Sequence, residues 1–157
     1  VYIESVWFQR MLYFYGVKIH LVGQVRESTI PFPCFFGVAP ASENDNQMLK
    51  QIAPKLSNGR LFCDKAYCDA EHKKLLLGQN IELLTPIKKI KNQYSFPGYE
   101  TFSRWVSSVR QPIESFFNWI QEKTKIQNAS KVRSTNGLKV HIFGRIAAAL
   151  LCMILPQ

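Results

Sequence analysis

Apolar and polar residues alternate at 17–22, in the segment VKIHLV, and this period of two predicts a β-strand. His20 falls on the second face of that strand, where we expect a structural or surface role rather than metal binding. A second short strand is predicted at 34–38, after Pro31 and Pro33. No element is predicted for the apolar first ten residues.

The middle of the chain alternates helices with strands. Apolar residues recur at helical spacing over 48–56, after several good N-cap residues, and an Asn-Gly pair ends this helix. Strands are predicted at 61–63 and 81–84, with a helix between them that stops near Gly78. The order β, β, α, β, α, β predicts an α/β fold.

The pattern becomes helical again from Ser103. One face of a helical wheel collects apolar residues: Trp105, Val109, Ile113, Phe116 and Ile120. Arg110 and Glu114 are four residues apart at the polar margin of that face, a spacing that by itself predicts an intrahelical salt bridge. Pro112 either kinks this helix or lies in the first turn of a new helix that starts near Gln111.

A final apolar helix is predicted from about Leu138 to Leu155. Its most apolar part, Ile146–Leu155, is too short to cross a bilayer and follows Arg145, so we expect a buried helix and no membrane partner. No signal peptide is visible. The cysteines and histidines lack the spacing of a zinc site or a disulfide framework, which favours a cytoplasmic location.

Composition adds an expected partner. The 157 residues fit one domain, 1–157, which we expect to be truncated because it opens inside an apolar segment. The net charge of +9 favours an anionic partner, although a merely soluble basic surface has the same composition. Residues 64–157 hold most of the excess, with fourteen Lys and Arg against seven Asp and Glu.

Two acids in this basic half are candidates for chemistry. Asp64 directly follows the apolar run 61–63, and an acid at the end of a buried strand is a common metal ligand. Asp at such a position is also a routine turn or cap residue. Glu114 is the second acid, and only tertiary packing can bring the two together. Clustered carboxylates that hold two divalent metals would serve phosphoryl transfer.

A basic and aromatic loop follows the strand at 81–84. It contains three lysines and three aromatic residues: Lys88, Lys89, Lys91, Tyr94, Phe96 and Tyr99. Such a loop either contacts nucleic acid, through phosphates and stacked bases, or is solvated with its aromatics packed back on the core.

Five segments, in order, resemble the C-terminal catalytic part of bacterial insertion-sequence transposases of the DDE class. YGVKIHLV is similar to that family's second strand, and APASENDN to the segment before its first core helix, where Asp45 matches a common Asp. DKAY at 64–67 resembles its D-K-G-Y motif, LLTPIKKIKNQ the next strand and basic loop, and RQPIESFF its R-x-x-I-E-x-x-F helix. The resemblance runs from about Tyr13 to Ala149.

This resemblance implies an RNase H-like mixed sheet flanked by helices, with a helical C-terminal end. It implies Asp64 and Glu114 as catalytic acids that bind two Mg²⁺ or Mn²⁺ ions. It also implies DNA, as transposon ends and target, as the partner of a homo-oligomer associated with the bacterial nucleoid. The expected DNA-binding residues are Lys65, Lys88, Lys89, Lys91, Arg104 and Arg110.

The chain also departs from the family pattern. The family carries its first catalytic Asp on a strand before YGVKIHLV, and Glu4 is the sole carboxylate among the twelve residues that precede Tyr13. Ala66 replaces a Gly, and Ser107 and Gln121 stand where some relatives carry Tyr and Lys. Glu4 is therefore the candidate for the third acid. Two alternatives stay open: a non-catalytic derivative that binds DNA or a full-length copy, and another RNase H-like nuclease that cleaves without strand transfer.

Overall fold

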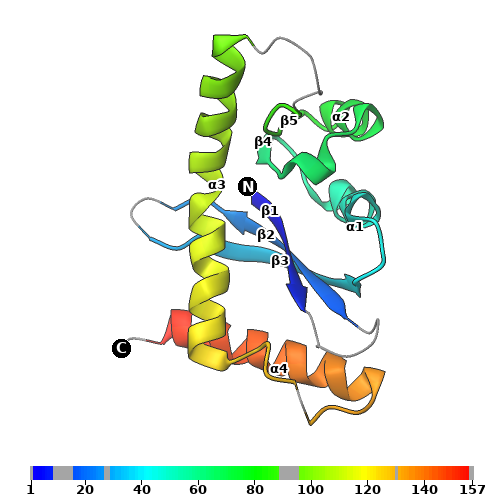
Figure 1. The fold of residues 1–157 in the computed structure, drawn as a ribbon, viewed down its shortest axis with the longest axis vertical. Coiled ribbons are helices and arrows are strands. Elements are labelled where there is room, and N and C mark those ends of the chain that lie inside the picture. Colours follow the sequence, from blue (N-terminus) through cyan, green and yellow to red (C-terminus); the bar gives the residue numbers. More distant parts are fainter. Residues whose placement is uncertain (1, 9–15, 27–28, 89–95, 130, 156–157) are drawn as a thin grey trace.

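The computed structural model describes residues 2–8, 16–26, 29–88, 96–129 and 131–155 (Figure 1). Over these ranges the chain forms one sheet of five strands: β1 (Tyr2–Phe8), β2 (Val17–Gln24), β3 (Phe32–Pro40), β4 (Gly59–Phe62) and β5 (Ile81–Leu84). The same ranges hold four α-helices: α1 (Asp45–Ile52), α2 (Ala70–Leu77), α3 (Pro97–Thr124) and α4 (Thr135–Ile154). Two short 3₁₀ helices follow α1 and β4: η1 (Ala53–Lys55) and η2 (Lys65–Tyr67).

The strands lie in the order β3-β2-β1-β4-β5. β1, β2 and β3 pair antiparallel, whereas β4 pairs in parallel with both β1 and β5. The helix α2 connects the parallel strands β4 and β5, as parallel pairing requires. This mixed sheet with flanking helices confirms the predicted α/β, RNase H-like fold.

The central strand β1 was not predicted from the hydrophobic pattern. Its sequence, YIESVWF, shows no sustained alternation of apolar and polar residues. It nevertheless pairs with β2 along one edge and with β4 along the other. Pairing on both edges explains why a segment with a weak local signal becomes the middle of the sheet.

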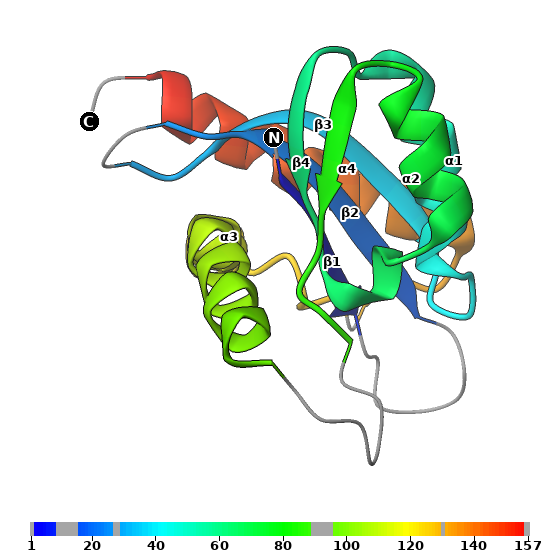
Figure 2. The ribbon, with the colours of Figure 1, turned by 90° about the horizontal axis from the view of Figure 1, so that it is seen from above.

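The sheet separates two apolar cores. Ile19 and Leu21 of β2 belong to the core beneath α3 and α4. Val22 belongs to the core beneath α1 and α2, and Lys18 and His20 share its face of the strand. Both of these polar side chains are buried. Figure 2 shows α1 and α2 on one side of the sheet and α3 on the other.

The long helix α3 is continuous over 28 residues and contains Pro112. The alternative of a new helix that starts near Gln111 is therefore wrong. The buried residues of α3 form one stripe: Val106, Arg110, Ile113, Phe116, Ile120 and Thr124. Trp105 was predicted on the buried face but is 43% exposed, whereas its neighbour Val106 is buried.

The C-terminal helix α4 lies across the end of α3 (Figure 1). It packs through a narrow stripe of Ile142, Ile146 and Ala149. Leu138, Leu150 and Met153 are partly buried against the same core. Four large apolar side chains of α4 are exposed: Val140, Phe143, Leu151 and Ile154. The prediction of a buried helix is therefore wrong. By length and composition alone α4 could cross a membrane, a test that core helices of soluble proteins also pass.

Candidate active site

Asp64 follows the end of β4 and begins the turn that leads into η2. Its Oδ1 accepts a hydrogen bond from the backbone N–H of Lys65 at 2.7 Å, and its carbonyl accepts one from the N–H of Tyr67 at 3.0 Å. The capping role that is common for a strand-end Asp is therefore present. The side chain is still 51% exposed, so its carboxylate remains accessible to a cation from solvent.

Arg110 of α3 brings the two candidate acids to one place. Its Nη1 lies 3.7 Å from Oδ1 of Asp64, and its Nη2 lies 4.0 Å from Oε1 of Glu114. Only 9% of the Arg110 side chain is exposed, whereas Glu114 is 48% exposed. The predicted intrahelical pair of Arg110 and Glu114 is thus part of a three-residue cluster that also contains Asp64. The predicted position of Arg110 at a polar margin is wrong, because α3 turns this residue toward the sheet.

The packing of α3 against β1 and β4 explains why the acids meet. Phe62, the last residue of β4, and Ile113, next to Glu114, lie in the same apolar core. The Phe62 ring also meets the Trp105 ring edge-on, with centroids 5.4 Å apart. This apolar contact holds the end of β4 beneath α3, two residues before Asp64. Acids that are 50 positions apart in sequence therefore reach the same guanidinium.

The backbone of β1 places Glu4 next to this cluster by register. Tyr2 pairs with Phe62 in the parallel ladder, and Glu4 and Asp64 each lie two residues further along. Glu4 also pairs with Leu21, which belongs to the core beneath α3. Paired positions share one face of a sheet, so the Glu4 position is on the face that α3 covers. The side chains of β1 lie outside the part of the structure that is described.

The donor atoms suit a hard divalent cation. Carboxylate oxygens are the ligands that Mg²⁺ and Mn²⁺ prefer, and Asp64 and Glu114 supply them from positions that solvent can reach. Among the described side chains, no group of three or more His, Cys, Asp or Glu gathers around one point. The described residues thus fit the carboxylate part of a metal site with two acids, and a third ligand would have to come from elsewhere.

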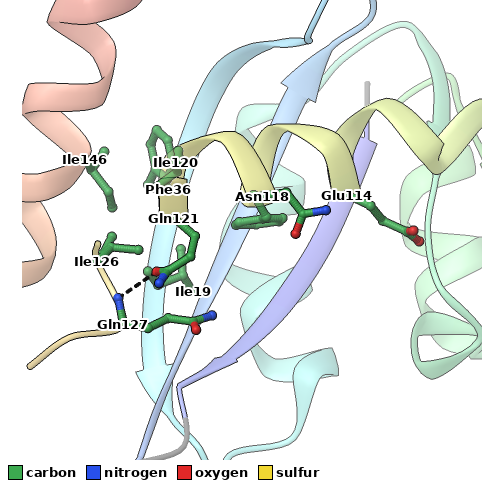
Figure 3. Close-up of a pocket in the computed structure, with 10 residues that line it drawn as sticks. Ile19, Phe36, Glu114, Asn118, Ile120, Gln121, Ile126, Gln127 and Ile146 are labelled. Atoms are coloured by element: carbon green, nitrogen blue, oxygen red, sulfur yellow. Dashed lines mark hydrogen bonds between the residues drawn. The ribbon is translucent and has the colours of Figure 1, made fainter. Parts of the chain in front are cut away.

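A pocket of about 330 Å³ opens beside Glu114 and runs along α3 toward α4 (Figure 3). Most of its lining is apolar: Ile19, Phe36, Phe117, Ile120, Ile126 and Ile146. Three amide side chains complete it, and Oε1 of Gln121 accepts a hydrogen bond from the backbone N–H of Gln127 at 3.0 Å. Gln121 stands where some transposases carry Lys. The lining therefore has no positive charge and suits an uncharged group better than a phosphate.

The predicted DNA-binding residues do not all face solvent. Lys65, Lys88 and Arg104 are exposed. A hydrogen bond from the backbone N–H of Ile87 to Oγ of Ser103, at 3.0 Å, holds the segment of Lys88 against the turn of α3 that carries Arg104. Two basic side chains far apart in sequence thus lie at the same end of α3. The other two predicted lysines lie outside the described residues: Lys89 and Lys91.

Two aromatic residues of the predicted basic loop are described. Phe96 and Tyr99 are both exposed, and their rings meet edge-on with centroids 5.4 Å apart. The alternative in which the loop aromatics pack back on the core is therefore wrong for these two residues. The two rings form an exposed aromatic pair at the N-terminal end of α3.

A second polar cluster lies on the opposite face of the sheet. Nζ of Lys18 donates to Oδ1 of Asp45 and to the carbonyl of Glu43, each at 2.8 Å. Nδ1 of His20 and the hydroxyl of Tyr67 form a buried hydrogen bond of 2.9 Å. Burial lowers the pKa of His20 below its ordinary value, and the Lys18 charge acts in the same direction against the opposing charge of Asp45.

The sequence contained a signal for this cluster that the pattern analysis missed. Lys18 and His20 alternate with apolar residues on a strand whose other face is buried. A strand in the middle of a sheet that helices cover on both sides must bury both faces, so its polar residues need partners. Asp45 and Tyr67 provide them, and both fall in segments that the sequence analysis had singled out for other reasons.

Comparison with known protein families gave one match to this chain. A family described as "Transposase DDE domain" matches residues 8–135, a span that includes Asp64, Arg110 and Glu114 but not Glu4. Comparisons with curated proteins and with solved structures gave no match.

Proposed function

Since the chain belongs to the family of transposase DDE domains, we propose that it cleaves and joins DNA strands by metal-dependent phosphoryl transfer. One observation carries this proposal. Asp64 and Glu114, which come from a strand end and from a distant helix, converge on a single guanidinium while both keep about half of their surface in solvent. Clustered, accessible carboxylates are what a site for divalent cations requires.

Asp64 and Glu114 would hold Mg²⁺ or Mn²⁺, in a site for up to two ions, with Glu4 as the third acid. Bound metal would supply a nucleophile at neutral pH and neutralise charge on the reacting phosphate. The backbone N–H of Lys65 orients the Asp64 carboxylate through the bond of 2.7 Å. The apolar stripe of α3 fixes the backbone that carries Glu114. These contacts position the acids before DNA binds.

The exposed basic residues would bind the DNA backbone around these acids. Lys65 adjoins Asp64 in sequence, and Lys88 and Arg104 share one end of α3. Cations in these places neutralise phosphates without reading sequence. We extend the same role to Lys89 and Lys91. The active form is proposed to be a homo-oligomer on paired DNA ends.

The test is nicking of supercoiled DNA in the presence of Mg²⁺ or Mn²⁺. We expect Asp64→Asn and Glu114→Gln each to reduce nicking to background while the circular dichroism spectrum is unchanged. The matched control is Glu122→Gln, because Glu122 is an exposed acid of the same helix with no place in the cluster. Nicking that persists in either acid variant would contradict the proposal. Joining of a labelled donor end to a target plasmid separates a transposase from a nuclease that only cleaves.

A second candidate, a DNA-binding protein without catalysis, rests on one observation. The described residues offer two acids and no group of three, and the third candidate, Glu4, has a longer side chain than the Asp of the family. In that case the wild-type chain binds DNA without nicking it. Glu4→Asp would then be the variant to examine, and nicking gained by it would identify Glu4 as the position of the third acid.

A further inference from the structure

We propose that Arg110 is an internal counter-ion for Asp64 and Glu114 that competes with divalent metal, and that it does not contact DNA phosphate. The inference deepens the proposed function and rests on it for the identity of the competing cation. It replaces the sequence-based assignment of Arg110 to DNA binding. It gives the metal-free protein a way to hold two acids close together.

Burial separates Arg110 from the other basic residues near the acids. Its side chain is 9% exposed and belongs to the buried stripe of α3, between Val106 and Ile113. Lys65 and Arg104 are exposed and can meet a phosphate without any rearrangement. A guanidinium that is removed from water needs compensating negative charge from the protein itself. The two acids are the described side chains that supply it.

The distances show that neither acid is hydrogen-bonded to Arg110. At 3.7 Å and 4.0 Å, the guanidinium nitrogens of Arg110 are too far from the carboxylate oxygens for hydrogen bonds. Coulomb attraction still acts over these distances. Each acid is therefore neutralised without being locked to Arg110, and it keeps a solvent-accessible side. A second cation can approach from that side.

Two kinds of cation then share the same carboxylates. In the absence of metal, Arg110 relieves the repulsion between Asp64 and Glu114. When a divalent cation binds, its charge and the guanidinium charge repel each other across a partly buried site, where screening by water is weak. Arg110 thus lowers the affinity for metal and raises the stability of the metal-free site.

Metal affinity is the first test. Mn²⁺ is titrated by calorimetry, without DNA, into the wild type, Arg110→Gln and Arg110→Lys. We expect the Kd of Arg110→Gln to fall about tenfold, and that of Arg110→Lys to stay near the wild-type value because the charge is retained. Mn²⁺ should also raise the Tm of Arg110→Gln more than that of the wild type. An equal or weaker affinity in Arg110→Gln overturns the inference.

Arg110→Gln removes a buried residue, so its folding is part of the test. If the variant is unfolded without metal, we expect Mn²⁺ to restore its circular dichroism spectrum, because the metal replaces the missing positive charge. An unfolded variant that Mn²⁺ does not restore counts against the counter-ion role.

The salt dependence of DNA binding is the second test, made in EDTA. We expect Arg110→Gln to leave the slope of log K against log salt unchanged. The matched control, Lys65→Gln, should reduce that slope by about 0.9, the value for one lost phosphate contact. An equal reduction in Arg110→Gln would restore Arg110 to the DNA-binding residues and overturn the inference.

A double-mutant cycle separates this inference from the proposed function. Arg110→Gln and Glu114→Gln are combined, and stability is measured by urea unfolding in EDTA. We expect the double variant to be more stable than the sum of the single effects predicts, because each single variant leaves a charge without its partner. Additive effects overturn the counter-ion role. The two measurements can also disagree. If the cycle shows this coupling but the wild-type chain binds no Mn²⁺, Arg110 is supported as a counter-ion and the metal-dependent function is contradicted.

Discussion

Two buried cations on opposite faces of the sheet meet carboxylates in contrasting ways. Lys18 lies 2.8 Å from Asp45, and the two side chains are only 5% and 13% exposed. Arg110 is buried to a similar degree, but its acids are half exposed and lie 3.7 Å and 4.0 Å away. The Lys18 pair is closed, with both partners out of water. The Arg110 cluster is open on the side of its acids.

The difference indicates what each cluster does. The closed pair joins β2 to the start of α1, and the hydrogen bond between His20 and Tyr67 joins β2 to the turn that begins at Asp64. Lys18 and Asp45 hold parts of the fold in place, and both side chains are largely shielded from solvent. The open cluster leaves its acids accessible to a cation from solution. The hydrogen bond between His20 and Tyr67 thus supports, from the other face of the sheet, the turn that carries Asp64.

The largest expected effect comes from opening the closed pair. Lys18→Met leaves Asp45 buried without its cation, and we expect the free energy of unfolding to fall by about 3–5 kcal/mol. The control is Lys50→Met, because Lys50 pairs with Glu71 on the surface. Loss of this surface pair should lower the free energy of unfolding by less than about 1 kcal/mol. Urea unfolding measures both. A loss in Lys18→Met no larger than that in Lys50→Met would contradict the assignment of Lys18 and Asp45 as a buried, stabilising pair.

The next effect concerns the hydrogen bond beside that pair. Tyr67→Phe leaves the imidazole of His20 without its hydroxyl partner in a buried site, and we expect a loss of about 1–3 kcal/mol. Tyr99→Phe is the control, since Tyr99 is exposed. Tyr67 lies in the turn that begins at Asp64, so a weakened turn should also misplace the Asp64 carboxylate. We therefore expect Tyr67→Phe to reduce nicking more than Tyr99→Phe does. Equal nicking in the two variants would show that the hydrogen bond between Tyr67 and His20 does not help to position Asp64.

The smallest effect is a dependence of stability on pH. Because the pKa of His20 is lower in the folded than in the unfolded protein, unfolding takes up a proton at pH values between the two. Stability should therefore fall as the pH drops below about 6.5, with a slope of at most about 1.4 kcal/mol per pH unit from this residue. His20→Gln should flatten that part of the profile. An unchanged profile would show that His20 does not contribute to it.

Local sequence patterns predicted much of the secondary structure and two of the candidate site residues. Alternation at 17–22 and the apolar runs at 61–63 and 81–84 are local signals that became strands. The helical spacing at 48–56 became α1, which ends at Ile52, and the 3₁₀ helix η1. Their order was enough to predict an α/β fold. The DKAY and RQPIESFF segments were enough to nominate Asp64 and Glu114, because the resemblance to a family depends on short segments in order.

Tertiary structure decided the features that depend on distant partners. β1 is a strand because β2 and β4 pair with its two edges, not because of its own pattern. Periodicity placed Arg110 at a polar margin, and only the packing of α3 on the sheet buried it between acids 50 positions apart. Likewise, the apolar sequence of α4 fixed a helix but not its burial, which depends on the surface that remains for it to cover. Local sequence determines the shape of a segment, and the partners that it meets are determined by the rest of the chain.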